Sequence, residues 1–193
     1  MARIREFDEM EILDKAVDLF WEKGYTATSA NDLVKGLGLS RSSLYSTYKD
    51  KRTLYVRALN RYRQRNVDAM LQLVRESDDM LATIEQIFNL VVEQDIHSKI
   101  PKGCLMVNSS IELGPHDEQI AEIVNQNEKN IEDAFEAAIL KGQKNGQIAP
   151  SHSAKSLARF IYNNISGLRV AVKTKADRSI LDDVINVSMS VLK

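Results

Sequence analysis

Hydrogen-bonding side chains are concentrated between residues 40 and 48 of the chain. They include one arginine, three of the four serines of this stretch and two tyrosines, namely Ser40, Arg41, Ser42, Ser43, Tyr45 and Tyr48. Arginine can pair with both major-groove acceptors of guanine, and hydroxyl groups can reach base edges or phosphate oxygens. These residue types therefore predict a helix whose polar face reads the major groove of DNA. The alternative is an ordinary helical hairpin with a solvated polar face.

Two short helices joined by a tight turn are expected between residues 29 and 48. Apolar residues recur at helical spacing in the first of them: Ala30, Leu33, Val34 and Leu37. Gly38 allows the chain to reverse direction, and Ser40 is a residue type suited to cap the second helix. In such a helix-turn-helix one helix braces another, which is the arrangement that a groove-reading helix requires.

The flanking residues complete a longer pattern. An earlier helix ends at Gly24, and a long helix follows Asp50. The stretch GYTATSANDLVKGLGLSRSSLYSTYKDKRTLY, residues 24–55, resembles the tetracycline-repressor (TetR) family of one-component bacterial transcriptional regulators. In that family a Gly-aromatic pair, a Thr-led helix, a Gly turn and a recognition helix ending in Leu-Tyr-x-x-aromatic follow in this order. Gly36, Ser42 and Tyr48 replace the more usual Ala, Gly and Phe.

The resemblance implies DNA contacts around the two short helices. Arg41 is the candidate for a guanine contact, and the capped start of the supporting helix favours a phosphate. The predicted DNA-binding residues are Thr28, Ser29, Ser40, Arg41, Ser42, Ser43, Tyr45, Tyr48, Lys49 and Lys51. For each of them the alternative is a solvated or packing side chain. Arg3 and Arg5 are expected to form a basic arm.

An all-α fold of about nine helices is expected. Beyond the first three helices, apolar residues recur at helical spacing in the segments 50–76, 79–97, 105–113, 117–144, 154–173 and 178–192. Together with the resemblance, this pattern predicts an N-terminal three-helix helix-turn-helix DNA-binding domain, residues 1–49. It also predicts a C-terminal helical effector-binding and dimerisation domain, residues 50–193.

A homodimer is expected because one recognition helix reads too few base pairs for useful specificity. In the family the last two helices pair with those of a second subunit as a four-helix bundle. The predicted dimerisation residues are Leu157, Phe160, Ile161, Ile165, Leu168, Ile180, Val184, Val187 and Val191. The alternative is that these apolar stripes face only the core of their own chain.

The family usually binds a small-molecule effector between these two regions. The candidate lining residues are Ile87, Phe88, Val91, Cys104, Met106, Phe135, Ile139 and Tyr162, and the apolar members are equally consistent with plain core. Cys104 lies at the expected start of a helix, next to Lys102, where a thiol can react with electrophiles or oxidants. Its Gly-Cys-Leu context is similar to one branch of the family that includes electrophile-responsive repressors. A small buried hydrophobe is the alternative reading of this cysteine.

Charge and composition agree with this prediction and disfavour other classes of protein. Residues 1–66 hold 13 Lys and Arg against 9 Asp and Glu, whereas the remaining residues are net acidic, and the whole chain carries −1. The single cysteine, the widely spaced histidines and the absence of a phosphate loop or nucleophile elbow predict no enzyme, metal site or cofactor. No apolar signal core or membrane span is apparent, so we expect a cytoplasmic location.

Overall fold

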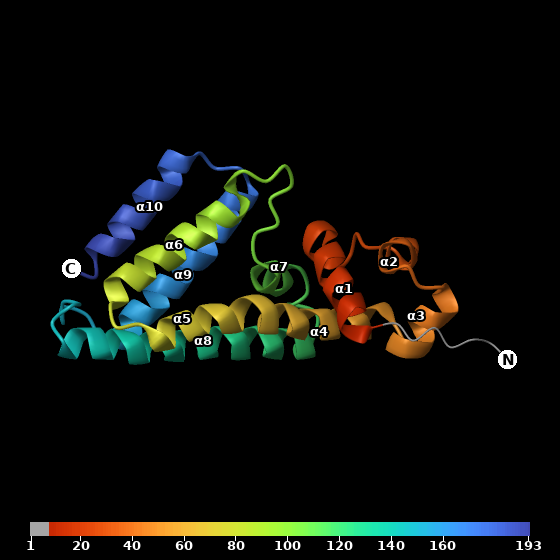
Figure 1. Cartoon of the computed structure of the whole chain (residues 1–193), viewed down its shortest axis with the longest axis horizontal. Helices are drawn as coiled ribbons and strands as arrows, with labels where there is room; N and C mark the ends of the chain where they lie inside the picture. The colour runs from red at the N-terminus through yellow and green to blue at the C-terminus, as the bar shows by residue number, and fades with distance from the viewer. Residues whose placement is uncertain (1–7) are drawn as a thin grey trace. The chain divides into compact units, whose positions relative to one another are not determined.

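The computed structural model describes residues 8–193, and every regular element in that range is helical (Figure 1). The all-α prediction is confirmed. None of these helices is both long and apolar enough to cross a membrane. The expected basic arm, Arg3 and Arg5, lies outside the described residues.

Ten α-helices and one π-helical turn follow one another between residues 8 and 193. They are α1 (Glu9–Lys23), α2 (Ala30–Leu37), α3 (Arg41–Tyr48), α4 (Lys51–Tyr62), the π-helical turn (Arg63–Val67), α5 (Asp68–Glu76), α6 (Met80–Ile96), α7 (Leu105–Glu112), α8 (Glu118–Lys144), α9 (Ala154–Lys173) and α10 (Arg178–Ser190).

The one additional helix arises within the segment 50–76, which the apolar pattern presents as a single helix. In the structure the π-helical turn Arg63–Val67 divides this segment into α4 and α5. In a π-helical turn the backbone hydrogen bonds join residues five apart instead of four apart, and this change needs neither a glycine nor a proline. The sequence RQRNV contains neither, so nothing in its composition indicates the interruption.

The chain divides by its internal contacts into two compact units, residues 1–65 and 66–193. We call them unit 1 and unit 2. The division falls later than the expected boundary between residues 49 and 50, because α4 packs along α1. Aromatic rings join these two helices: Phe20 meets Tyr55 edge to face at 4.9 Å between ring centroids, and Trp21 meets Tyr62 at the same distance. Such pairs add to the stability that burial provides.

Two glycines fix the turns of unit 1. Gly24 ends α1 with φ 82°, and its amide donates to the Phe20 carbonyl oxygen at 2.8 Å. Gly38 ends α2 in the left-handed conformation, with φ 68° and ψ 22°. Side chains at such φ values are disfavoured, so glycine sets the reversal that directs α3 across α2.

Unit 2 is built around the long helices α8 and α9, which pack against each other. Helix α6 packs on α9, α5 and α7 pack on α8, and α10 contacts both α6 and α9. The largest fully buried side chains of this unit include Phe88, Phe135 and Ile84. This core positions the cavities described below.

Candidate nucleic-acid interface and ligand cavities

The N-terminus of α3 carries a connected group of hydroxyls. Ser40 caps the helix, its Oγ accepting a hydrogen bond from the Ser43 amide at 3.1 Å. The hydroxyls of Ser42 and Ser43 lie 3.0 and 2.8 Å from the same Oγ. Ser40 and Ser42 are exposed and Ser43 is half-buried. Hydroxyls beside the first amides of a helix form a site suited to phosphate or base acceptors.

Arg41 is held in place by the supporting helix. Its Nη2 donates to Oδ1 of Asn31, on α2, at 2.9 Å, and both residues are exposed. Tyr45, one turn further along α3, is 36% exposed. The structure therefore groups Arg41, Tyr45 and the serines on the surface of α3. Sequence reasoning missed Asn31, although an exposed amide in the first turn of the supporting helix is the signal that could have identified it.

Lys49 occupies a sharp turn between α3 and α4. Its backbone has φ 64° and ψ −56°, and the Asp50 amide donates to the Tyr48 carbonyl oxygen at 2.6 Å. These values describe a γ-turn, which is strained for a residue with a side chain. The Lys49 side chain is exposed. It is therefore available to a phosphate, whereas its backbone is held in a costly conformation.

Three of the predicted contact residues are packing residues in this structure. Thr28 is fully buried, and its hydroxyl donates to the Gly24 carbonyl oxygen at 2.6 Å. Tyr48 is 1% exposed, its hydroxyl is buried without a partner among the described residues, and burial raises its pKa. Both side chains lie in the core, where the Tyr48 ring and the Thr28 methyl group help to fill the space.

Lys51 is the third of these residues. Its Nζ donates to the carbonyl oxygens of Tyr25 at 2.9 Å and Thr28 at 2.8 Å, and it lies 4.3 Å from the centre of the Tyr25 ring. The ammonium thus joins the start of α4 to the loop between α1 and α2. In this structure the ammonium group therefore pairs with two backbone carbonyl oxygens, and its phosphate contact stays a prediction.

Ser29 is exposed but locally engaged. It forms a capping box with Asp32, whose amide donates to Ser29 Oγ at 3.1 Å and whose Oδ2 accepts from the Ser29 amide at 2.9 Å. The hydrogen bond from Lys23 Nζ to Asp32, at 2.5 Å, and those from Ser29 lower the pKa of the Asp32 carboxyl. The carboxylate therefore stays ionised, and the capping box fixes the direction in which α2 starts.

The predicted dimerisation residues fall into two groups. On α9 the stripe faces the core of its own chain, which is the alternative that the sequence left open; its buried members are Leu157, Ile161, Ile165 and Leu168, and Phe160 is half-buried. On α10 a second stripe faces outward: Ile180, Val184 and Val187 are 53%, 36% and 63% exposed, and Val191 is half-buried. The spacing of four, three and four residues keeps this stripe on one side of the helix.

Most predicted effector residues are core side chains. Phe88, Met106, Phe135 and Ile139 are at most 2% exposed. Ile87 and Val91 also line a hollow of about 220 Å³, together with residues from α5 and α9. Burial of an apolar side chain is favourable whether it packs against protein or against a ligand. The residue type alone therefore does not distinguish a core residue from a ligand-binding residue.

Cys104 and Tyr162 are both half-buried. Burial raises the pKa of Tyr162 to about 12, and the charge of Glu128 also raises it, whereas a hydrogen bond with Ser166 opposes the shift. The loop that carries Cys104 is fixed by the buried Asp95, whose Oδ2 accepts from the Gly103 amide at 2.6 Å. The half-buried thiol stands at the N-cap of α7.

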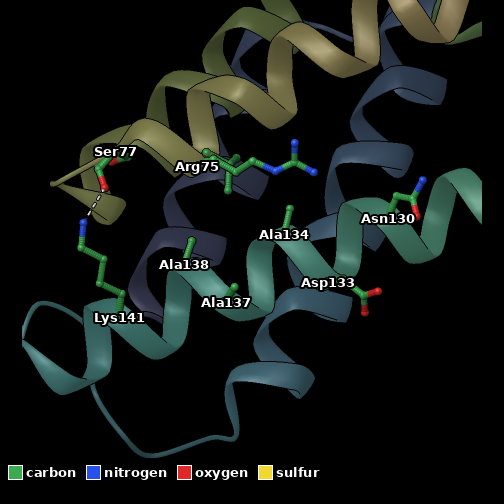
Figure 2. A pocket seen from close by; sticks show the side chains of 9 residues that line it. Arg75, Ser77, Asn130, Asp133, Ala134, Ala137, Ala138 and Lys141 are labelled. Carbon is green, nitrogen blue, oxygen red and sulfur yellow. Dashed lines mark hydrogen bonds between the residues drawn. The ribbon is translucent and has the colours of Figure 1, made fainter.

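A second hollow, of about 440 Å³, lies between α5 and α8. Figure 2 shows its three alanines along α8 and the side chain of Arg75 extending from α5. At one end Lys141 Nζ donates to the Ser77 carbonyl oxygen at 3.3 Å and pairs with Asp78 at 2.8 Å. The residues that line this hollow on α8 include Ala134, Ala137 and Ala138. None of the predicted effector residues is among its lining residues.

The fold and the exposed polar helix define a helix-turn-helix DNA-binding protein. Residues 12–58 match the family of bacterial regulatory proteins of the tetR type, and residues 80–187 match the tetracyclin repressor-like C-terminal domain. The chain belongs to the TetR family of transcriptional regulators, which are DNA-binding proteins and not enzymes.

Relatives and solved structures agree with this assignment. The chain is 33% identical over 193 residues to the uncharacterized HTH-type transcriptional regulator YezE of Bacillus subtilis, covering 100% of both chains. It is 29% identical to the HTH-type transcriptional repressor ComR of Escherichia coli, over 91% of this chain and 84% of that one. A cysteine mutant of the TetR family regulator CifR, complexed with 26 bp double-strand operator DNA, has the same fold. Its TM-score is 0.86 at 22% identity, over 99% of this chain and 100% of that one.

Proposed function

We propose that the chain is a homodimeric, sequence-specific repressor, acting in the cytoplasm and released from operator DNA by a small apolar or electrophilic effector. The observation that carries this proposal is the exposed polar surface of α3, where Asn31 holds the Arg41 guanidinium at 2.9 Å. An arginine restrained in this way loses less side-chain entropy when it pairs with guanine. Ser40, Ser42, Ser43, Tyr45 and Lys49 would add base or phosphate contacts around it.

The outward stripe of α10 supports the homodimer. Exposed valines and an isoleucine at helical spacing are costly in water, and a second copy of the same helix would cover them. A dimer would place two copies of α3 roughly 34–36 Å apart, in successive major grooves. The effector would favour a dimer conformation in which this spacing no longer matches the DNA.

Two features of unit 2 support an effector. The hollow containing Ile87 and Val91 has apolar walls that suit a reversible ligand. Cys104, half-buried at the N-cap of α7, would instead react with an electrophile. The two routes predict different responses to loss of the thiol.

Binding to DNA from upstream of the protein's own gene tests the proposal. We expect specific binding that weakens steeply with salt, because phosphate contacts release counterions. N-ethylmaleimide should abolish it in the wild type and not in Cys104→Ser if the effector is electrophilic. Binding that ignores the reagent would favour the apolar ligand. Salt-independent binding, or equal affinity for any sequence, would contradict the proposal.

Analytical ultracentrifugation tests the dimer. Val187→Asp places a charge in the outward stripe of α10 and should convert the dimer to monomer. Asn186→Asp is the matched control, because it adds the same charge at the neighbouring exposed position. A monomeric wild type, or an unchanged dimer in Val187→Asp, would contradict the assignment of this surface.

A further inference from the structure

The hollow of about 220 Å³ in unit 2 has a wall of apolar side chains from α5 and α6: Ala69, Met70, Leu73, Ile87, Leu90 and Val91. Leu90 is 53% exposed, so part of this apolar wall meets water. The volume lies below the range of about 300–1,000 Å³ that drug-sized ligands occupy. The space therefore suits a small molecule with an apolar body.

Arg169, on α9, supplies the positive charge of this hollow. Its side chain is half-buried, and within residues 8–193 its guanidinium has no ion-pair or hydrogen-bond partner. Three exposed arginines of unit 2 stand in other surroundings: Arg159 pairs with Glu132, Arg178 pairs with Glu93 and Asp182, and Arg75 lines the larger hollow, whose lining includes the carboxylate of Asp133. Arg169 thus differs from them in standing beside an apolar surface without an anion.

The other polar residues that line the hollow are Asn66 and Gln94, and the described lining contains no carboxylate. A partly desolvated cation without a partner is unfavourable, and an anion that pairs with it removes this cost. The planar guanidinium matches a carboxylate through two parallel hydrogen bonds. One cation balances one negative charge, so a monoanion fits better than a doubly charged phosphate.

We propose that this hollow binds a small monocarboxylate with an apolar body. The carboxylate pairs with Arg169, and the apolar body lies against Leu73, Ile87 and Val91. The inference rests on the proposed function, because it names the chemical class of the reversible effector. Ile87 and Val91 were expected effector residues, whereas Arg169 was not, since a single arginine in a long helix carries no signal of its own.

Calorimetric titration of the full chain at neutral pH tests the binding. The ligands are straight-chain carboxylates from butanoate to decanoate, benzoate, and the primary amide matching each acid. We expect at least one acid to bind, with its amide about tenfold or more weaker.

Arg169→Gln should show the same loss for the acid. Arg159→Gln is the matched control, because it removes the same charge from an exposed position on the same helix. Ala69→Trp, at an exposed position, should block the hollow.

Three results would overturn the proposal: no acid binds at millimolar concentration, Arg169→Gln binds the acid as tightly as the wild type, or the amide binds as tightly as the acid. Operator binding is measured separately on the same proteins. Release from DNA by the acid in the wild type, and not in Arg169→Gln, would support the effector role. Acid binding without any sequence-specific DNA binding would leave this site standing and contradict the proposed function.

Discussion

The exposed polar side chains of unit 1 and the cavity-lining side chains of unit 2 are positioned in different ways. In unit 1 the exposed polar groups of α3 are positioned by partners near in sequence: Ser40 with Ser43, and Arg41 with Asn31. In unit 2 the hollow beside Ile87 joins three helices, and its cation, Arg169, is more than seventy residues further along the chain. The surface of α3 thus depends mainly on local hydrogen bonds, whereas the cavities of unit 2 depend on how the whole bundle packs.

The difference has a functional consequence. We expect a change on the exposed face of α3 to alter DNA binding while leaving the fold of unit 1 intact. Under the proposed function, a change among the apolar residues of unit 2 should alter packing first and ligand binding second, because the same side chains would serve both. The following predictions test this contrast.

Phe135→Ala should have the largest effect. The side chain is fully buried in unit 2, so its removal should lower the free energy of unfolding by about 3–5 kcal/mol. Chemical denaturation measures this loss. Leu140→Ala is the control, because Leu140 lies on the same helix and is 44% exposed. A stable Phe135→Ala protein with altered effector affinity would show that Phe135 lines a ligand site instead.

Lys51→Met tests the reassignment of Lys51 to packing. It keeps most of the aliphatic chain and removes the two hydrogen bonds to backbone carbonyls, which should destabilise unit 1 by about 1.5–3 kcal/mol. The salt dependence of operator binding should not change. A decrease of about one in the slope of log affinity against log salt would instead identify a phosphate contact. Lys35→Met, at an exposed position of α2, serves as the control.

Arg41→Ala tests the exposed face of α3. We expect operator binding to weaken by about 1–3 kcal/mol and the base preference at one position to relax, with stability unchanged. Asn31→Ala should cause a smaller loss, because the guanidinium remains but is no longer restrained. Titration of operator and point-mutated operator duplexes measures both effects. Unchanged affinity and specificity in Arg41→Ala would remove it as the reading residue.

Lys49→Gly separates fold from contact at one residue. Glycine relieves the positive φ, so unit 1 should become more stable by about 1 kcal/mol. Operator binding should weaken for all sequences alike, and its salt slope should fall by about one. Thermal unfolding and DNA titrations at several salt concentrations measure the two effects. A loss of stability would mean that the Lys49 side chain stabilises this turn by more than its strained backbone conformation costs.

Asp14→Asn should have the smallest effect. Hydrogen bonds from Arg61, at 2.7 and 2.9 Å, lower the pKa of the Asp14 carboxyl below its ordinary value of 3.8. A lowered pKa gives stability that is fully present above the unfolded value and is lost as the pH falls through the folded value. Because the pair is partly exposed, we expect a loss of about 0.2–1 kcal/mol at neutral pH. Denaturation at decreasing pH should show this difference disappear under acidic conditions.

The sequence by itself determined the all-α fold, the helix-turn-helix and most helix boundaries. Residue types with local consequences carried this information: Gly24 and Gly38 at positive φ, and Ser40 as a cap. These features act within a few positions along the chain, so they can be recognised without knowing the packing. The polar face of α3 could be predicted for the same reason.

Only the tertiary structure decided which apolar or long side chains face inward. It turned Tyr48 and Thr28 into the core, committed Lys51 to backbone carbonyls, and separated the buried stripe of α9 from the outward stripe of α10. It also placed Arg169 beside a hollow formed mainly by two other helices. Helical spacing fixes which residues share a face, but burial of that face depends on neighbours distant in sequence.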